Sequence, residues 1–476
     1  MSFRSLGDSV IPLNVLNPVE IISNKNPKKI LLVNPADPWL RNGGDRPSLG
    51  TLYLAGWLKF TKAADPYVID MNHYSGDELM TRIEEVKPDY IGISLTTPQY
   101  EEAVKTAARI KTSGYTMPII AGGPHVTAMQ NVPKVPEVMP EAFFDYCIFG
   151  AGERTLERIC KQGLPNNRII KGEPMPEGKN LDWLVRPARE LVDMKRYTLK
   201  IMGKPAQPIM TSFGCPYKCT YCSEPILNHF FKAHSPERVL MEMEELKYNY
   251  GAEGLIIYDD VFSIDSRRAM KIADMMIERK LDLVYRCTTR GTDFTRHPDL
   301  ADKLRESGCV EACIGLESAD DDVLSVNDKG MTVEDNRRAI EAIKRSGMKC
   351  LTYMITGLPK CTRETEQKSL DFVMDNNVDE CGWYLLAPFP STPLWIDREK
   401  YGLEIFEDEI IRNNWDVAQC RADNNQLTCY VDYSKSGGMN RYEIKETWLA
   451  MREKLDEWHK RKDMHGIQDH FLEAVK

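Results

Sequence analysis

The sequence has 476 residues, a formal net charge of −9, 42% hydrophobic residues and 28% charged residues. At roughly 150 residues per domain, this length predicts about three domains. A small disulfide-stapled scaffold and a disordered chain are therefore excluded. The acidic balance argues against a protein that mainly binds a phosphate backbone, so we expect no nucleic acid partner.

No targeting or membrane segment is expected. The N-terminal MSFRSLGDSVIPLN lacks the basic stretch and apolar run of a secretory signal. No apolar run approaches the roughly 20 residues that cross a bilayer. We therefore predict a cytoplasmic protein whose thirteen cysteines are reduced, most of them buried apolar thiols. Cys215, Cys219 and Cys222 differ, because they fall within eight residues, which is typical of a metal or cluster site.

From residue 28 onward, short β-branched runs alternate with amphipathic stretches, which predicts βαβ units and a parallel sheet. The result is an α/β, doubly wound Rossmann-like domain over residues 28–162, after an N-terminal extension over 1–27. Its expected strands are Ile30–Val33, Tyr67–Asp70, Tyr90–Leu95, Pro118–Ala121 and Tyr146–Phe149. Ligands bind beyond the carboxyl ends of such strands. The candidate binding residues in these loops are Trp39, Ser94, Thr96, Gly122, Gly123, His125, Gly150, Gly152 and Glu153.

A second alternating series follows a Pro-, Gly- and charge-rich linker over residues 163–205. It predicts a partial (β/α)6 TIM-type barrel over residues 206–395. Its expected strands are Ile209–Phe213, Leu255–Tyr258, Leu283–Cys287, Val310–Ile314, Cys350–Ile355 and Cys381–Leu386, with helices such as Pro236–Tyr250 and Val333–Ser346.

The last part of the chain, residues 396–476, is predicted to be small and mainly helical. Asn440–Lys462 has the apolar spacing of one amphipathic helix. We expect this region, with Trp415 and Arg421, to lie on the substrate side of the barrel. Simple packing against the barrel is the alternative.

The three crowded cysteines share one loop, Cys215-Pro-Tyr-Lys-Cys219-Thr-Tyr-Cys222, directly after the first strand of the second series. Three thiolates leave one iron of a four-iron cluster without a protein ligand, and a small molecule can bind there. A structural zinc ion completed by His229 or His234 is the alternative, because three cysteines and one histidine form a common closed site. The position at a barrel mouth favours a catalytic cluster.

This loop resembles that of the radical S-adenosylmethionine (SAM) superfamily, whose C-x-x-x-C-x-aromatic-C pattern it matches fully. Four later segments extend the resemblance, each where a barrel strand meets its loop: YDDVF at 258–262, GLES at 315–318, GLP at 357–359 and APFPSTPL at 387–394. The resemblance implies a [4Fe–4S] cluster on the three cysteines, with SAM on its open iron. The implied SAM contacts are Tyr221 near adenine, with Asp259 or Asp260, Glu317 and Ser318 at the polar groups.

The two aspartates have an alternative role, because they precede a predicted helix near Ser263. Asp is a favoured helix N-cap, and capping alone would explain Asp259 and Asp260.

The first domain also resembles a known one. PSLGTLYLAGWL at 47–58, IIAGGPHVT at 119–127 and CIFGAGERTL at 147–156 are similar to the cobalamin-binding domain joined to many radical SAM proteins. The glycine pairs in these segments let a flat ligand or a phosphate tail lie against the backbone. An ordinary nucleotide site or tight turns are the alternatives. Together the resemblances cover residues 28–395 and imply a cobalamin-dependent (class B) radical SAM enzyme.

The segment Asp70-Met-Asn-His73-Tyr-Ser-Gly76 is close to the D-x-H-x-x-G signature of cobalamin domains that supply a histidine below cobalt. Its spacing is one residue too long, and it follows the second strand rather than the first. We therefore expect no histidine ligand. Trp39 or a neighbour is expected to cover the lower face, and His73 to lie at the surface or in a cap.

The resemblances imply a C-methyltransferase. A 5′-deoxyadenosyl radical from SAM would abstract hydrogen from an unactivated carbon, and methylcobalamin would supply the methyl group. An external one-electron reductant of the ferredoxin or flavodoxin type is the implied partner. The alternatives are a cobalamin-dependent oxidoreductase or cyclase resembling the anaerobic magnesium-porphyrin cyclase, and a non-catalytic cobalamin sensor.

The substrate stays open among several classes. The composition suits a strict anaerobe, and the resemblance extends to methanogen enzymes that C-methylate residues such as glutamine in methyl-coenzyme M reductase. A protein or peptide is thus one class, beside hopanoid lipids and antibiotic precursors. Tyr353 and Tyr384 lie on predicted barrel strands and are candidates to relay a proton or an electron, with core packing as the favoured role.

Overall fold

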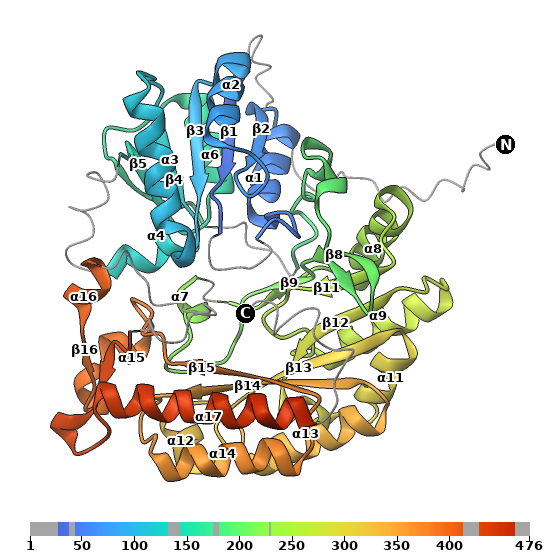
Figure 1. Cartoon of the computed structure of the whole chain (residues 1–476). Helices are drawn as coiled ribbons and strands as arrows, with labels where there is room; N and C mark the ends of the chain where they lie inside the picture. The colour runs from blue at the N-terminus through green and yellow to red at the C-terminus, as the bar shows by residue number, and fades with distance from the viewer. Residues whose placement is uncertain are drawn as a thin grey trace.

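The computed structural model describes residues 27–37, 43–131, 143–174, 180–227, 230–412 and 428–461. The predicted α/β class is confirmed, because two mainly parallel sheets carry helices on their faces and the second is curled into a half-barrel (Figure 1). The candidate residues Trp39, His229, Trp415 and Arg421 lie outside the described ranges, as does Lys462 at the end of the predicted helix. Within those ranges, none of the helices combines the length and hydropathy that a membrane-spanning segment needs.

The N-terminal sheet has six parallel strands in the order β2-β1-β3-β4-β5-β6. They are β1 (Lys28–Asn34), β2 (Ala64–Asp70), β3 (Tyr90–Ser94), β4 (Ile119–Gly122), β5 (Tyr146–Phe149) and β6 (Ile169–Lys171). Its helices are α1 (Leu49–Phe60), α2 (Gly76–Val86), α3 (Tyr100–Thr112), α4 (Pro124–Ala128) and α6 (Glu153–Gln162). The chain order reverses between β1 and β3, where such sheets bind ligands. All five predicted strands are present, and β6 comes from the predicted linker, where proline and glycine on both sides conceal its short apolar run.

The half-barrel sheet contains β8 (Lys204–Ile209), β11 (Gly254–Ile257), β12 (Val284–Thr289), β13 (Cys309–Glu317), β14 (Lys349–Thr356) and β15 (Glu380–Leu385), all parallel. A seventh strand, β7 (Lys200–Ile201), pairs antiparallel with β8. The helices between them are α8 (Pro236–Tyr250), α9 (Ser266–Glu278), α10 (Gly291–Arg296), α11 (Leu300–Glu306), α12 (Asp321–Val326), α13 (Val333–Arg345) and α14 (Arg363–Asp375).

The predicted strand over Ile209–Phe213 is wrong, because the first barrel strand ends at Ile209. The backbone N–H of Thr211 donates to Asp259 at 2.6 Å, and the Ser212 hydroxyl donates to the same carboxylate at 2.6 Å. These bonds turn the chain out of the sheet. Ser212–Phe213 then pairs antiparallel, as β9, with β10 (Lys232–Ala233).

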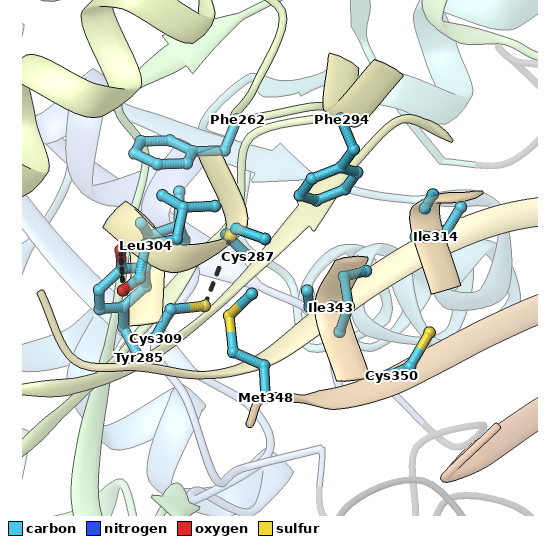
Figure 2. Close-up of a cluster of buried hydrophobic side chains, with 14 of the residues drawn as sticks. Phe262, Tyr285, Cys287, Phe294, Leu304, Cys309, Ile314, Ile343, Met348 and Cys350 are labelled. Carbon is cyan, nitrogen blue, oxygen red and sulfur yellow. Dashed lines mark hydrogen bonds between the residues drawn. The ribbon is translucent and has the colours of Figure 1, made fainter. Parts of the chain in front are cut away.

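Side chains on the barrel strands alternate between a face packed under the helices and a concave face. Figure 2 shows part of the core on the helix-covered face, where the sulfurs of Cys287 and Cys309 lie 3.9 Å apart beside Phe294 and Met348. Because side chains alternate along a strand, the intervening positions face the concave side. These residues are Arg286, Glu311, Cys313, Tyr353, Glu380 and Tyr384.

The prediction that most of the cysteines are buried is confirmed for the described residues. Among the described cysteines only Cys215 and Cys222 are partly exposed, and every other one is buried. The two exceptions belong to the crowded loop.

The C-terminal helix α17 (Arg441–Arg461) packs on the helix-covered face of the barrel. Trp448, Met451 and Leu455 join the core beneath Trp383, and the Trp448 indole N–H donates to the Trp383 carbonyl at 3.0 Å. The predicted substrate-side position is therefore wrong for this helix, because its apolar stripe is already satisfied by packing. The rest of this region includes α15 (Pro393–Ile396), α16 (Glu407–Arg412) and a hairpin of β16 (Glu404–Ile405) and β17 (Val431–Asp432).

The carboxyl ends of the two sheets face each other across one junction (Figure 1). A single hydrophobic cluster runs through it, from Val126 and Met129 of the first domain to Leu358 and Leu394 of the barrel region. The Ser391 hydroxyl donates to the Ala128 carbonyl at 2.7 Å across the same junction. The packing therefore holds the two edges in one relative position.

Candidate active site

The cysteine loop is clamped by two later segments of the chain through Thr220. Its backbone N–H donates to the Asn327 carbonyl at 3.1 Å, and its hydroxyl to Asn327 Oδ1 at 2.9 Å. Its carbonyl accepts from the backbone N–H of Leu394 at 2.9 Å. The middle of the loop is thus fixed between the segment after α12 and the segment that follows β15.

The three thiols share one electrostatic neighbourhood. Burial raises the pKa of Cys222 to about 12, and the thiols of Cys219 and Cys215 add to the rise. Burial likewise raises the pKa of Cys215, with Asp260 and Cys219 contributing. The described residues hold no group of three or more Cys, His, Asp or Glu side chains arranged around one point as a metal site. Three soft thiols on one clamped loop nevertheless have the donor chemistry of a cluster with one open iron.

The zinc alternative gains no support from the described residues. His234 is 2% exposed, and its Nδ1 lies 3.6 Å from Asp182 Oδ1. This distance is within ion-pair range of a carboxylate of the connecting segment, although neither ring nitrogen makes a hydrogen bond.

Tyr221 carries a buried polar atom beside the cysteines. Its hydroxyl is buried and makes no hydrogen bond of normal geometry, while its ring packs into the cluster at the domain junction. Burial raises the pKa of Tyr221 well above its ordinary value, and Glu317 and Cys219 add to the rise. A buried hydroxyl without a partner fits a ligand with polar atoms, as SAM has.

Glu317 ends β13 with a φ of +67°, in the left-handed region where a non-glycine residue is strained. Its carboxylate accepts from Lys329 Nζ at 2.9 Å. Ser318 is 1% exposed, and its hydroxyl accepts from the Asp320 N–H at 3.2 Å at the start of α12. Glu317 therefore lies next to Tyr221 at the barrel mouth, whereas Ser318 is used within its own loop.

The two aspartates of YDDVF have different surroundings. The carboxylate of Asp259 is 3% exposed and accepts three hydrogen bonds from Thr211 and Ser212. Asp260 remains accessible, yet surrounding protein raises its pKa, and Glu224 of α7 (Glu224–Leu227) lies within hydrogen-bonding reach. The capping alternative is wrong for both, because Asp265 is the N-cap of α9. Of the pair, Asp260 stays the candidate for SAM.

Sequence reasoning missed Arg290, which follows β12 directly. The residue is 5% exposed, and its guanidinium carbon lies 3.6 Å from the ring centroid of Tyr217, inside the cysteine loop. Nε and Nη2 are buried without a hydrogen-bond partner. Its place at the carboxyl end of a barrel strand is a signal that could have identified it.

The edge of the N-terminal sheet carries a closed polar network at the β1/β3 reversal. Gln99 Nε2 donates to the Pro35 carbonyl at 2.8 Å and to Asn34 Oδ1 at 3.3 Å. Asn34 Nδ2 donates to Asp70 Oδ1 at 3.0 Å, and the Thr96 hydroxyl donates to Gln99 Oε1 at 3.0 Å. The hydrogen bond to Gln99 thus holds Thr96 at the β1/β3 reversal, where such sheets bind ligands.

Glycines shape the rest of this edge. Gly123 has a φ of +99°, and a Cβ there would lie 2.8 Å from the Leu95 backbone and 3.0 Å from the Ser94 hydroxyl. Gly150 has a φ of +91° and open space within 4 Å of its missing Cβ, which fits a ligand lying against the backbone. Gly122 is also nearly open, whereas a Cβ on Gly152 would meet Leu54 at 3.1 Å.

Glu153 begins α6 beside Gly152, and burial raises the pKa of its carboxyl. It lies at the carboxyl edge of the sheet, next to the glycine pair of the predicted cofactor loop.

The two histidines of this edge differ in burial, because His125 is buried and His73 is only half-buried. His125 is 1% exposed, with Nδ1 3.2 Å from the Thr97 hydroxyl and its ring 4.8 Å from that of Tyr100. Burial lowers the pKa of His125 to about 3, so the imidazole is neutral. Its contact with a cofactor stays a prediction. His73 is half-buried against the Tyr197 ring at 4.9 Å, and Ser75 instead caps α2.

Two family models match the regions built above. Residues 209–373 match the radical SAM superfamily, and residues 40–160 match the B12 binding domain. The chain belongs to the cobalamin-dependent radical SAM enzymes. The predicted cofactors are confirmed as a [4Fe–4S] cluster, SAM and cobalamin.

Alignments with named relatives cover most of the chain of this radical SAM enzyme. An uncharacterized methyltransferase of Pyrococcus horikoshii, PH0819, is 28% identical over 77% of the chain and 82% of that protein. The anaerobic magnesium-protoporphyrin IX monomethyl ester cyclase of Rubrivivax gelatinosus is 26% identical over 75% and 69%. The structure of the radical SAM methyltransferase TsrM from Kitasatospora setae, with cobalamin and a [4Fe–4S] cluster bound, superposes with a TM-score of 0.64 and 20% identity, over 80% of this chain and 81% of that one.

These relatives are enzymes, and the prediction of an enzyme of the radical SAM methyltransferase class is confirmed. The non-catalytic sensor alternative is therefore set aside.

Proposed function

We propose that this enzyme methylates an unactivated carbon. When bound, SAM on the cluster supplies the hydrogen-abstracting radical, and methylcobalamin supplies the methyl group. An external one-electron reductant supplies the electrons. Each methyl transfer then consumes two SAM molecules, one yielding 5′-deoxyadenosine and methionine and the other S-adenosylhomocysteine.

The observation that carries this proposal is the junction of the two sheet edges. The Ser391–Ala128 hydrogen bond and the contact between α4 and α7 hold the cysteine loop opposite the glycine edge of the cobalamin domain. A carbon between the two cofactors would be accessible to both. The residues proposed to hold the groups are those of the sequence prediction, apart from Asp259, which Thr211 and Ser212 engage, and Trp39, which lies outside the described ranges. They are Cys215, Cys219 and Cys222 for the cluster; Tyr221, Asp260, Glu317 and Ser318 for SAM; and Ser94, Thr96, Gly122, Gly123, His125, Gly150, Gly152 and Glu153 for cobalamin.

The concave face of the barrel supports a substrate with a hydrogen-bond donor. Arg286 and Glu311 form an ion pair of 3.6 Å, and Glu380 is 7% exposed with Oε1 lacking a hydrogen-bond partner. Burial raises the pKa of Glu380 to about 7. A primary amide supplies both a donor and an acceptor to such a carboxyl. A glutamine side chain in a protein or peptide is therefore the substrate that we propose.

Tyr353 and Tyr384 lie on the same concave face, with ring centroids 6.1 Å apart. Burial raises the pKa of Tyr353 well above its ordinary value, so this phenol stays protonated at neutral pH. A protonated phenol at this position can hold a substrate carbonyl, and the relay role stays a prediction.

The test is product analysis after anaerobic purification with iron, sulfide and hydroxocobalamin. The protein is incubated with a reductant, SAM carrying a deuterated methyl group, and glutamine-containing peptides. We expect 5′-deoxyadenosine and S-adenosylhomocysteine together, and deuterium in the peptide. Deuterium transfer without 5′-deoxyadenosine would contradict hydrogen abstraction.

A second candidate is a cyclase or oxidoreductase without methyl transfer, favoured by the similarity to the magnesium-protoporphyrin cyclase over three quarters of the chain. The same experiment separates the two. Under the cyclase reaction, 5′-deoxyadenosine forms with bound cobalamin while no S-adenosylhomocysteine and no deuterated product accumulate.

A further inference from the structure

Arg290 lies buried at the mouth of the barrel, directly after β12. Nε and Nη2 are buried without an acceptor, and the residue forms no ion pair with any residue in the described ranges. Asp293, the carboxylate of the following turn, is engaged instead by the Ser263 hydroxyl at 2.5 Å. A buried guanidinium without acceptors is strongly unfavourable unless an anion completes the site.

The guanidinium is also held in one orientation. Tyr217 covers one of its faces at 3.6 Å, and Gly330 lies so close that a Cβ there would be 3.4 Å from Nη2. Stacking on an aromatic face orients the planar fork and leaves its edge free to bind an anion. This is a preorganised receptor rather than a flexible surface cation.

The anion receptor formed by Arg290 and Tyr217 lies against the cysteine loop. Tyr217 lies between Cys215 and Cys219 in sequence, and the segment that carries Gly330 is clamped to the same loop through Asn327 and Thr220. The next cation, Lys329, is already paired with Glu317 at 2.9 Å. Arg290 is therefore a buried cation at this mouth whose Nε and Nη2 are open to an incoming anion.

SAM carries one anionic group, its α-carboxylate, beside a cationic ammonium and a cationic sulfonium. We propose that Arg290 binds the α-carboxylate of SAM through Nε and Nη2, and that Tyr217 acts as its positioning residue. Glu317 and Asp260, on the neighbouring strand ends, have the charge that suits the cationic groups. This proposal rests on SAM binding at the cysteine loop and is independent of what happens to the methyl group.

The test compares SAM with decarboxylated SAM, which lacks only the carboxylate. Anaerobic binding is measured on the full-length holoenzyme, with cluster and cobalamin loaded, for wild type, Arg290→Met and Arg290→Lys. We expect Arg290→Met to weaken SAM binding by about tenfold or more, as loss of a charge-assisted pair does. Its affinity for decarboxylated SAM should stay within about twofold of wild type, and Arg290→Lys should retain part of the affinity for SAM.

Two results would overturn the proposal. The first is an equal loss of affinity for both compounds, which would mean a general disturbance of the site. The second is unchanged SAM affinity together with a shifted midpoint potential of the cluster, which would assign Arg290 to balancing the cluster charge.

The controls keep the outcome interpretable. Arg267→Met removes an exposed arginine of α9 and should change neither affinity. Iron content and the absorbance of bound cobalamin report folding of each variant, and Arg290→Lys serves if the methionine variant loses iron. Because binding is measured without turnover, failure of methyl transfer leaves this test unaffected.

Discussion

The two sheet edges that meet at the junction are built in opposite ways. At the barrel edge, the hydroxyl of Tyr221 and two nitrogens of Arg290 are buried without partners. At the cobalamin-domain edge, the polar side chains of Asp70, Asn34 and Gln99 satisfy one another. These barrel groups leave hydrogen-bonding capacity open to a ligand. The Asp70–Asn34–Gln99 network is satisfied within the protein, beside the open backbone of Gly150.

The difference follows from the size and charge of what binds. SAM is small and charged, so a few directed side chains with open hydrogen-bonding capacity can recognise it. Cobalamin is large and flat, so we propose that it lies on a backbone surface without obstructing Cβ atoms, such as the open backbone at Gly150. A closed network keeps that surface rigid while contributing few directed contacts.

The largest effect is expected from Cys219→Ala, because the loop then has two thiols for a cluster that needs three. Iron content and 5′-deoxyadenosine formation should fall to background, while cobalamin absorbance stays at the wild-type level. Cys160→Ala removes a buried thiol of α6 and is the control. This variant should keep wild-type iron content and 5′-deoxyadenosine formation. Loss of cobalamin in Cys219→Ala would show that the two edges are not independent.

Asn327→Ala should loosen the cysteine loop without removing a ligand. The buried asparagine joins Thr220 to the Val323 carbonyl, and its loss leaves those groups unpaired, at a cost of about 2–3 kcal/mol in unfolding free energy. Iron release to a chelator should be faster than in wild type. Asn249→Ala on the exposed face of α8 is the matched control, and equal release rates in the two variants would contradict the clamp.

Gln99→Leu probes the other edge. Removing the amide that joins Asn34 to Pro35 should lower the stability of the cobalamin domain by about 1–3 kcal/mol and weaken cobalamin binding. Iron content should not change, because the hydrogen bonds of Gln99 join it to Asn34, Pro35 and Thr96 of the first domain. Thermal unfolding and cobalamin titration measure the effect, with the exposed Gln162→Leu as control. A drop in iron content would remove the distinction between the edges.

The smallest effect concerns His125. Its folded pKa of about 3 lies below the usual 6.5, so the unfolded chain binds a proton that the folded chain does not. Stability is therefore full above the unfolded pKa and decreases as the pH falls, by about 1 kcal/mol between pH 7 and pH 5.5. His125→Gln should flatten this dependence in chemical unfolding of the cobalamin domain, and His297→Gln should not.

The sequence pattern predicted those features that depend on residues close together in the chain. The spacing of Cys215, Cys219 and Cys222 places three soft ligands on one short loop in any fold. Apolar periodicity located the strands of both sheets, with β5 and α8 at their predicted bounds. It failed for β6, a run of three residues whose strand pairing depends on a distant neighbour, β5. It also misplaced β8, which ends at Ile209 where the predicted strand begins.

The sequence by itself thus determined the two domains' fold class, the three cysteines and the cofactors that the motifs imply. Only the tertiary structure decided which polar groups remain open to a ligand. Asp259 and Asp260 are adjacent and chemically identical, yet Thr211 and Ser212 engage the first and leave the second accessible. Arg290 becomes a receptor because Tyr217 stacks on it and Asp293 is engaged elsewhere. Such contacts join residues far apart in the chain, and burial, which makes an unpaired charge costly, exists only once the chain has folded.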